Sequence, residues 1–485
     1  MKQKIPLWIA LVFILVFLLR LPSLFEPYSY GDEAIYLTLG EAARKGLVFY
    51  RDIHDNKPPL LYLLAAISGN LFWFRFLLLV WNLATIYLFY KLAQVLFPRK
   101  EKATKAVTFI FAILSSVPLL EGNIANAEIF MILPTILGVF LFFKTKVKKA
   151  KNYFLIGILF SLSTLFKIPA AFDFAALFFF FVFFSSKEKF HWKNLAIDCL
   201  FLILGFIFPI LLTFIYYVFE GGLKQYLTAA FFQNIPYLSS WQQGSGSFGF
   251  NFGVVNRGIL LLFVVTILWL FRKKWGEVIS FIIIWFLFAL FGATLSGRPY
   301  PHYLVQILAP VSLLIITFFV AKTHLKIIIL AFFGLIWGAV IYFNFWSYPN
   351  LSYYQNFLAF TLGQKSQEEY LRHFGGKVIR NYRLAQFLQT TTKPNEKIFI
   401  WGDSPVIYAL ARRLPVGRYT AAYHIIDFNG YGEVMDALNK NKPRIIIDLA
   451  EKDHPFPQLE AFLAENYSLI ISIEEAKVYH LGTWK

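Results

Sequence analysis

The sequence is poor in cysteine and in acidic residues. Its 485 residues include one cysteine, Cys199, which excludes an intramolecular disulfide and a metal site built from several thiolates. Charged residues make up only 15% of the chain, whereas soluble globular proteins carry about 25%. There are 28 acidic residues against 46 lysines and arginines, so the net charge is +18. These values do not describe an ordinary soluble domain.

Long hydrophobic runs are abundant instead. Hydrophobic residues make up 58% of the chain, and many runs are long enough, or nearly so, to cross about 30 Å of hydrocarbon. We therefore predict a polytopic α-helical membrane protein with about eleven transmembrane helices. The first run follows "MKQK" without a small-residue cleavage site, so we expect it to be retained. The runs cover residues 6–24, 74–97, 106–120, 127–143, 153–167, 169–185, 195–219, 254–271, 278–295, 303–321 and 325–345.

Lysine and arginine are concentrated in alternate connections between these runs, such as "PRKEKATK" and "KTKVKKAK". The short connections between them contain almost none. In a membrane protein this alternation marks the cytoplasmic side, so the positive charge does not indicate a nucleic-acid partner. It predicts a multi-pass protein of the cell (plasma or inner) membrane with a cytoplasmic N-terminus. Residues 25–73 and the tail after residue 345 would then lie outside.

The tail differs from the rest of the chain. Residues 346–485 are polar, and "NEKIFIWG" and "KPRIIIDLA" predict short strands, while "SPVIYALARR" and "GEVMDALNKN" predict helices. We expect a transmembrane catalytic domain at 1–345 and a small extracytoplasmic α/β domain at 346–485, with a mostly parallel sheet. "WGDSP" is too short to count as a phosphate-binding glycine motif.

Polar side chains gather in the predicted outer loops. In the first loop, Ile35 and Leu39 share one face of a helix that starts near Asp32 and ends near Gly46, which indicates an amphipathic interfacial helix. "HDNKPP" follows, and its two prolines restrict the backbone around Lys57. The polar candidates near the outer ends of the spans are Asp32, Glu33, His54, Asp55, Lys57, Glu128, Lys167, Arg298, His302 and Tyr303.

These motifs resemble those of the GT-C glycosyltransferases, specifically the protein O-mannosyltransferase-like group with its aminoarabinose and Rgt-type transferases. The likeness is carried by "GDEAIYLTLGEAARKG" and "YRDIHDNKPPLLYLL", and supported by "FKIPA" and "GRPYPHYLVQILAP". It implies a GT-C fold and inverting transfer of a sugar from a polyprenyl-phosphate donor at the outer face. The acceptor would be a lipid, a glycan or a protein, and membrane lipids would surround the enzyme.

The resemblance also implies roles for individual residues. Asp32, with Glu33 beside it, would be the catalytic carboxylate that takes the proton from the acceptor hydroxyl. Lys57 would offset the charge of the leaving phosphate. Asn56 stands where the aminoarabinose branch has the glutamate of "EKPP", so a divalent metal is not supported and we assign neither a metal ligand nor a cofactor. The other implied substrate-binding residues are His54, Asp55, Glu128, Lys167, Arg298, His302 and Tyr303.

Each assignment has a structural alternative. Asp32 could only cap the interfacial helix, Glu33 could be an acid favoured in a first turn, and Lys57 or Lys167 could reach toward lipid headgroups. For the whole protein, the alternative is a secondary transporter or a lipid-linked-sugar flippase. Transporters place charges near the bilayer midplane, where this chain has one main candidate, Asp173. The outer position of the other polar residues favours a transferase.

Overall fold

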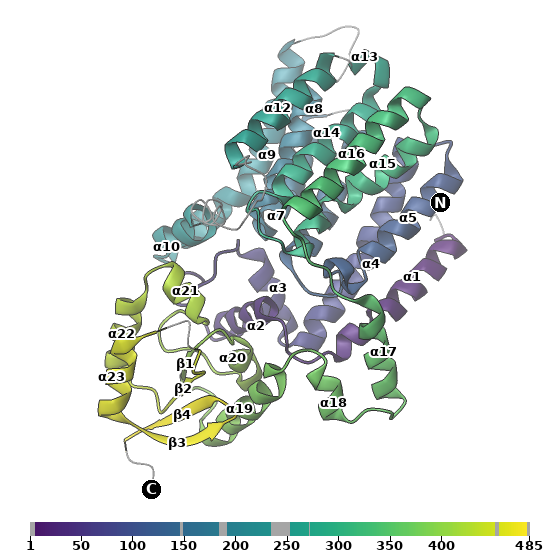
Figure 1. Cartoon of the computed structure of the whole chain (residues 1–485). Helices are drawn as coiled ribbons and strands as arrows, with labels where there is room; N and C mark the ends of the chain where they lie inside the picture. Colours follow the sequence, from purple (N-terminus) through teal and green to yellow (C-terminus); the bar gives the residue numbers. More distant parts are fainter. Residues whose placement is uncertain are drawn as a thin grey trace. The chain divides into compact units, whose positions relative to one another are not determined.

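The computed structural model describes residues 5–145, 149–183, 192–233, 253–270, 272–451 and 455–482, and its elements are labelled in Figure 1. Two compact units make up the chain. Unit 1 consists of Met1–Ser23, Arg75–Tyr216 and Phe231–Asn350, and unit 2 consists of Leu24–Phe74, Tyr217–Ala230 and Leu351–Lys485. The domain boundary at residues 345 and 346 stays a prediction. In the structure, Leu24–Phe74, which includes the predicted first outer loop, packs together with the tail in unit 2.

The apolar runs form helices, as predicted. Within the described residues, six helical segments have the length and composition to cross a membrane, and four shorter apolar helices accompany them. The prediction of a polytopic helical membrane protein is confirmed, while the number of eleven spans stays a prediction. Residues 184–185 and 271, at the ends of two predicted runs, lie outside the described residues. The helices are α1 (Leu7–Arg20), α4 (Leu71–Leu96), α5 (Glu101–Leu114), α6 (Ala127–Lys144), α7 (Ala150–Phe166), α8 (Ala171–Phe183), α9 (Trp192–Phe219), α12 (Val254–Leu270), α13 (Arg272–Trp275), α14 (Glu277–Ala293), α15 (Leu308–Val320) and α16 (Thr323–Tyr342).

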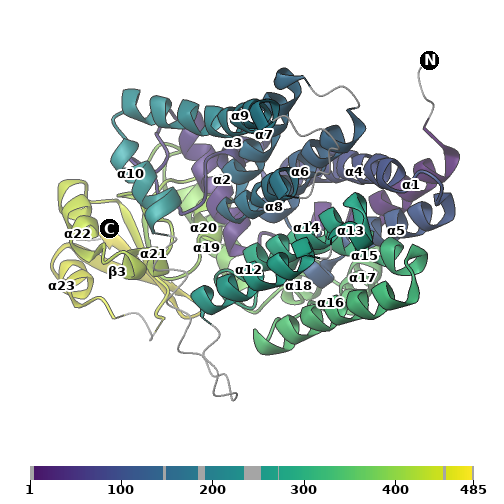
Figure 2. The same ribbon diagram turned by 90° about the horizontal axis from the view of Figure 1, so that it is seen from above.

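Small residues and a central helix hold unit 1 together. A Cβ atom on Gly157 of α7 would lie 2.2 Å from the carbonyl oxygen of Leu202, and one on Gly205 of α9 would lie 2.0 Å from that of Phe154. The two helices therefore touch through their backbones, as small residues allow in membrane bundles. Helix α14 packs against both α8 and α15, an arrangement that can be followed in Figures 1 and 2.

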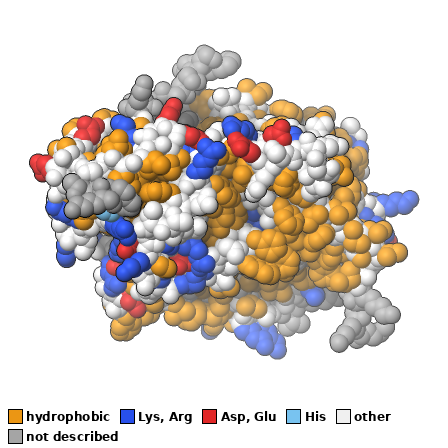
Figure 3. All heavy atoms as spheres, turned by 90° about the horizontal axis from the view of Figure 1, so that it is seen from below, with side chains coloured by type: hydrophobic (Ala, Val, Ile, Leu, Met, Phe, Trp, Pro, Cys, Tyr) orange, Lys and Arg blue, Asp and Glu red, His pale blue; other side chains and the backbone are white. Residues whose placement is uncertain are grey.

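Hydrophobic side chains are exposed along several of these helices. Leu7 and Leu11 of α1, Val255 of α12, and Trp337 and Ile341 of α16 are all largely exposed. Figure 3 shows one face of the molecule, on which hydrophobic side chains form a broad area. An exposed apolar surface of this extent marks contact with lipid or with another protein. It agrees with a membrane location.

The predicted break between the apolar runs 153–167 and 169–185, at "FKIPA", is present in the structure. Helix α7 ends at Phe166, Lys167 has an extended backbone, and the short 3₁₀ helix η3 (Ile168–Ala170) leads into α8. Asp173 follows in the first turn of α8, where it is buried. Its carboxylate accepts hydrogen bonds from Trp285 Nε1 at 2.6 Å and Gln306 Nε2 at 2.7 Å. Because a polar group inside a bundle must be satisfied by protein, these bonds account for its presence there.

Unit 2 contains a four-stranded sheet in the order β1–β2–β4–β3. Phe399 and Ile446 pack with α21–α23, while Ile400 and Ile447 pack with α19 and α20 on the opposite face. The two predicted strands, β1 and β2, are thus covered by helices on both faces of the sheet, which explains their continuous apolar runs. The elements are α17 (Asn350–Thr361), α18 (Gln367–Arg372), α19 (Lys377–Thr391), β1 (Phe399–Trp401), α20 (Val406–Ala411), α21 (Ala422–Asp427), α22 (Tyr431–Lys440), β2 (Ile445–Asp448), α23 (Pro457–Asn466), β3 (Tyr467–Ile473) and β4 (Ala476–Leu481).

The predicted strands and helices of the tail are confirmed, but the expectation of a mostly parallel sheet is wrong. Only β1 and β2 pair in parallel, and β4 pairs antiparallel with both β2 and β3. Strands β3 and β4 are joined by Glu474 and Glu475 alone, and Glu474 has a φ of 54°. A connection of two residues permits only an antiparallel hairpin.

The segment predicted to be the first outer loop contributes two helices to unit 2. Helix α2 (Gly31–Arg44) packs closely against α3 (Leu60–Ser68). A Cβ atom on Gly40 would lie 2.6 Å from the backbone nitrogen of Ala66, so glycine is needed at this contact. Helix α2 ends as predicted: Gly46 has a φ of 80°, and the Leu47 N–H donates to the Ala42 carbonyl oxygen, the arrangement of a Schellman end.

The exposed polar face of α2 is narrower than that of the amphipathic interfacial helix that the sequence predicted. Glu33 is 2% exposed, and residues 34–40, which follow it in the helix, are buried as well. Both α3 and α20 pack against α2. Pro405, just before α20, lies 3.8 Å from the position that a Cβ on Gly31 would occupy. The sequence pattern of an isolated interfacial helix could not reveal these neighbours.

We predict that Gly40→Ala lowers the stability of the protein by about 1–3 kcal/mol, because the new methyl group would force α2 away from α3. Gly432→Ala is the matched control, since nothing lies within 4 Å of a Cβ at that exposed position in α22. It should be neutral or stabilising by about 0.5 kcal/mol. Thermal unfolding in detergent compares the two variants, and equal midpoints would contradict the close contact.

Candidate active site

Asp32 lies in the first turn of helix α2, where part of its side chain is accessible. The N-cap of α2 is Tyr30, which makes no side-chain capping bond, and the helix starts at Gly31. Asp32 is therefore not the cap that a purely structural role would require. About a third of its side chain is exposed (33%), whereas the adjacent Glu33 is buried. Of the two predicted carboxylates, only Asp32 is accessible to a substrate in this structure.

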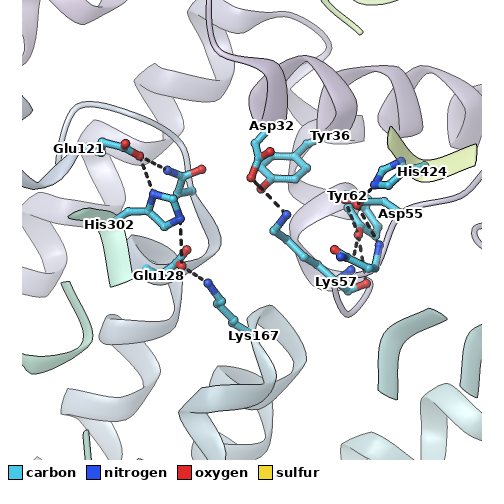
Figure 4. A network of polar contacts seen from close by, with 12 residues as sticks. Asp32, Tyr36, Asp55, Lys57, Tyr62, Glu121, Glu128, Lys167, His302 and His424 are labelled. Atoms are coloured by element: carbon cyan, nitrogen blue, oxygen red, sulfur yellow. Dashed lines mark hydrogen bonds and ion pairs between the residues drawn. The ribbon is translucent and has the colours of Figure 1, made fainter. Parts of the chain in front are cut away.

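Two side chains converge on the Asp32 carboxylate (Figure 4). Lys57 Nζ lies 3.2 Å from Asp32 Oδ2, and the Tyr36 hydroxyl donates to the same oxygen at 2.9 Å. The Lys57 ammonium also lies 4.9 Å from the centre of the Tyr36 ring. The structure thus brings together Asp32 of "DE" and Lys57 of "KPP", the two residues on which the sequence argument depended most.

The backbone of Lys57 is fixed by two buried tyrosines. The Tyr50 hydroxyl donates to the Lys57 carbonyl oxygen at 2.7 Å, and the Tyr62 hydroxyl accepts the Lys57 N–H at 2.9 Å. Burial raises the pKa of both phenols well above the usual range. Both hydroxyls therefore keep their protons, and the Lys57 backbone is held before the prolines direct the chain into α3.

His54 and Asp55 lie inside unit 2 rather than at its surface. Both are 1% exposed. The Tyr62 hydroxyl lies 2.9 Å from Asp55 Oδ2, and His424 Nε2 of α21 lies 3.5 Å from Asp55 Oδ1. The ring of His54 packs against Tyr419, His424 and Phe428. Burial, together with repulsion from His424 and Arg418, moves the pKa of His54 well below its usual range.

A second polar cluster lies in unit 1 (Figure 4). Glu128, in the first turn of α6, pairs with Lys167 at the hinge after α7. His302, in the 3₁₀ helix η6 (Pro301–Ile307), places Nδ1 2.6 Å from Glu121 and Nε2 3.5 Å from Glu128. Lys167 Nζ also lies 3.9 Å from the centre of the Tyr303 ring. Four predicted residues from three distant segments therefore lie together, which their separate motifs did not show.

Glu121 is a member of this cluster that the sequence argument missed. It is buried, has a left-handed backbone (φ 55°) and accepts a hydrogen bond from Asn126 at 2.9 Å. Burial and then Glu121 itself raise the pKa of Tyr348 to about 12. The available signal was an acid directly after an apolar run, a few residues before Glu128. The other candidate, Arg298, is half-buried in the connection before η6.

A metal site is not evident in the described part of the chain. No group of three or more His, Cys, Asp or Glu side chains there has the arrangement to hold a metal ion. The absence of a metal from our assignment stays a prediction.

No protein-family model matches the sequence, and no curated protein matches it. Two crystal structures of ArnT from Cupriavidus metallidurans are similar, each at 12% identity with 97% of both chains covered. The TM-score is 0.60 for the apo state and 0.58 for the complex with undecaprenyl phosphate. The oligosaccharyltransferase AglB from Archaeoglobus fulgidus matches 98% of this chain and 74% of its own at 12% identity, with a TM-score of 0.49. The chain shares the fold of ArnT, a GT-C transferase, so the predicted fold is confirmed.

We predict that Glu128→Ala lowers the free energy of unfolding by about 3 kcal/mol or more, because it leaves a poorly exposed Lys167 without its carboxylate. Adding Lys167→Met in the same chain should restore much of the loss, since no unpaired cation then remains. Midpoints of thermal unfolding in detergent measure both. Strictly additive losses in the double variant would show that the two side chains do not act as a pair.

Proposed function

We propose that the protein is an integral-membrane inverting glycosyltransferase that moves a sugar from a polyprenyl-phosphate donor to a lipid, glycan or protein acceptor. The observation that carries this proposal is the contact of Asp32 with Lys57, a partly exposed carboxylate and an ammonium 3.2 Å apart. Their arrangement suits a reaction that needs a proton acceptor and a cation close together. The shared fold with ArnT, whose crystal structure holds undecaprenyl phosphate, supports this class of donor.

The proposed reaction is a single displacement at the anomeric carbon of the sugar. The acceptor hydroxyl oxygen forms a bond to this carbon, and the bond from the carbon to the phosphate oxygen breaks on the opposite face. The electron pair of the broken bond leaves with the polyprenyl phosphate. Asp32 takes the proton of the acceptor hydroxyl, as a positioned general base. Its buried neighbour Glu33 supports the first turn of α2 instead.

Lys57 would stabilise the phosphate group as it leaves. The phosphate gains negative charge when the bond breaks, and a fixed ammonium lowers the energy of that state. The Lys57 backbone is held by Tyr50 and Tyr62, so little ordering is needed when the substrate binds. Tyr36 donates to Asp32, which keeps the carboxylate oriented while the Lys57 side chain moves between its two partners.

We propose, independently of the site in unit 2, that the cluster in unit 1 binds an anionic or hydroxyl group. Lys167 and His302 offer donors suited to a phosphate or to sugar hydroxyls, and the Tyr303 ring lies against Lys167. We propose that Glu128 holds Lys167 in place until a substrate anion is bound, and that Arg298 adds a further cation. Because unit 2 buries His54 and Asp55, their proposed role is to support the loop that carries Lys57.

We also propose that the reaction takes place on the outer side of the cell membrane. Lysine and arginine are concentrated in every other connection between the predicted spans, and such connections all lie on one side of a membrane. This pattern supports a cytoplasmic N-terminus and an extracytoplasmic C-terminal domain. Asp32 and Lys57 belong to the first outer loop in this orientation. A polyprenyl chain would anchor the donor in the same membrane.

We predict that Asp32→Asn lowers sugar transfer at least about 100-fold, because the amide cannot take the proton. Lys57→Met should also reduce transfer strongly, since the leaving phosphate loses its cation. The assay uses purified full-length protein in lipid nanodiscs, radiolabelled polyprenyl-phosphate sugars and membrane extract as the source of acceptor. Both variants must keep the wild-type unfolding midpoint to be informative.

Glu41→Gln is the matched control, because Glu41 lies on the same helix but pairs with Arg44 and Arg412. It should transfer sugar at the wild-type rate. Wild-type activity in Asp32→Asn would rule out this residue as the base. If no donor supports transfer, while vesicles containing the protein take up or flip a lipid-linked sugar, the transporter or flippase is the correct function.

A further inference from the structure

The C-terminal α/β domain contacts the loop that carries Lys57 at several points within unit 2. The His54 N–H donates to the Arg418 carbonyl oxygen at 2.8 Å, and the Arg418 guanidinium donates to the Tyr50 carbonyl oxygen at 3.3 Å. On the other side of α2, Arg412 pairs with Glu41 at 3.2 Å. These contacts join residues that are more than 350 positions apart in the sequence. The tail and the first outer loop therefore form one body.

Asp55 is the point where the loop, helix α3 and the tail meet. Its Oδ1 accepts the Asn56 N–H at 2.8 Å and lies 3.5 Å from His424 Nε2. Its Oδ2 lies 2.9 Å from the Tyr62 hydroxyl. Both Asp55 and His424 are almost completely buried. A carboxylate in such a place is fixed by its few neighbours, because solvent does not compete with them.

His424 faces Asp55 with one ring nitrogen. The other, Nδ1, is buried without a hydrogen-bond partner among the described residues. Burial lowers the pKa of His424, so its ring is neutral near pH 7 and carries one proton. When this proton is on Nε2, the nitrogen faces the Asp55 carboxylate as a hydrogen-bond donor. At 3.5 Å the contact is longer than an ordinary hydrogen bond, so its effect on Asp55 is mainly electrostatic.

The contacts of Asp55 lead directly to the proposed active site. The Tyr62 hydroxyl that meets Asp55 also accepts the Lys57 N–H, and the Lys57 ammonium lies beside Asp32. A shift of Asp55 would move Tyr62 and the Asn56 amide, and with them the backbone of Lys57. Figure 4 shows these side chains in sequence, from His424 through Asp55 and Tyr62 to Lys57 and Asp32.

We propose that His424, in the C-terminal domain, is a positioning residue that holds Asp55 and thereby sets the place of Lys57. The inference rests on the proposed function for the role of Lys57, but the contact itself does not. It gives the α/β domain a direct part in catalysis: the domain supplies the side chain that fixes the loop. Without this contact, the Lys57 ammonium would no longer be held beside the Asp32 carboxylate.

The test compares His424→Leu with His424→Gln in the full-length protein in nanodiscs. The glutamine amide nitrogen can occupy the place of Nε2 and donate to Asp55, whereas leucine cannot. We expect His424→Leu to lower kcat/KM for the donor by about 10-fold or more, since misplacement by about 1 Å can cost 100-fold. His424→Gln should stay within about threefold of the wild type, and KM for the acceptor should not change in either variant.

Hydrogen–deuterium exchange of the same proteins gives a second readout, which needs no transfer. In His424→Leu, the amides of Asn56 and Lys57 should exchange at least about 10-fold faster, because their acceptors become mobile. The amides of β1 and β2 should keep their wild-type protection. Ile425→Val is the control: it removes a buried methylene group from the same helix and should lower the unfolding midpoint without changing exchange in the loop.

The outcomes separate this inference from the proposed function. If His424→Leu only lowers the unfolding midpoint, with unchanged loop exchange and unchanged kcat/KM, His424 has no positioning role. Equal losses in His424→Leu and His424→Gln would also overturn the proposal. If the wild type transfers no sugar, the proposed function fails, and the exchange of Asn56 and Lys57 still decides whether His424 fixes the loop.

Discussion

The proposed active site depends on how closely helix α2 approaches α3. Gly40 lets the backbones touch, since a Cβ there would lie 2.6 Å from the Ala66 nitrogen. Helix α3 begins directly after Pro59, so this contact fixes the position of the loop just before it. Lys57, in that loop, is thereby brought beside the first turn of α2, where Asp32 lies. The 25 residues that separate Asp32 from Lys57 thus comprise helix α2 and the loop that leads back to its first turn.

Buried charge imposes a second constraint, in unit 1. Taking an ion out of water costs several kcal/mol unless a partner is present, and here every member of the cluster has one. Glu128 is shared between Lys167 and His302, and His302 lies between Glu128 and Glu121. The extended backbone at Lys167 and the left-handed backbone at Glu121 are local irregularities that direct these side chains. In the binding role proposed for Lys167, an anion would have to compete with Glu128, and a phosphate would do so better than a singly charged ligand.

Much of the fold could be predicted, because hydrophobic runs, prolines and glycines act locally. The helices, the hinge before Pro169 and the end of α2 at Gly46 all follow from nearby sequence. Asp32 and Lys57 could be assigned to one site because their motifs resemble those of the GT-C glycosyltransferases. The missed features depend on distant contacts: β4 joins β2 to β3, Glu33 is buried by its neighbours, and Asp55 meets a histidine far along the chain. Periodicity and composition carry no information about such pairs.

The burial of Asp55 explains why the tail matters to a site that it does not itself contain. In water, a carboxylate would exchange its partners freely, and its contact with Tyr62 would do little to place Lys57. The helices and loops of the α/β domain cover the loop, so Asp55 and His54 are nearly inaccessible. In this dry surrounding an electrostatic contact is stronger and its geometry is better defined. The domain therefore contributes twice, through the side chain of His424 and through the exclusion of solvent that makes this side chain effective.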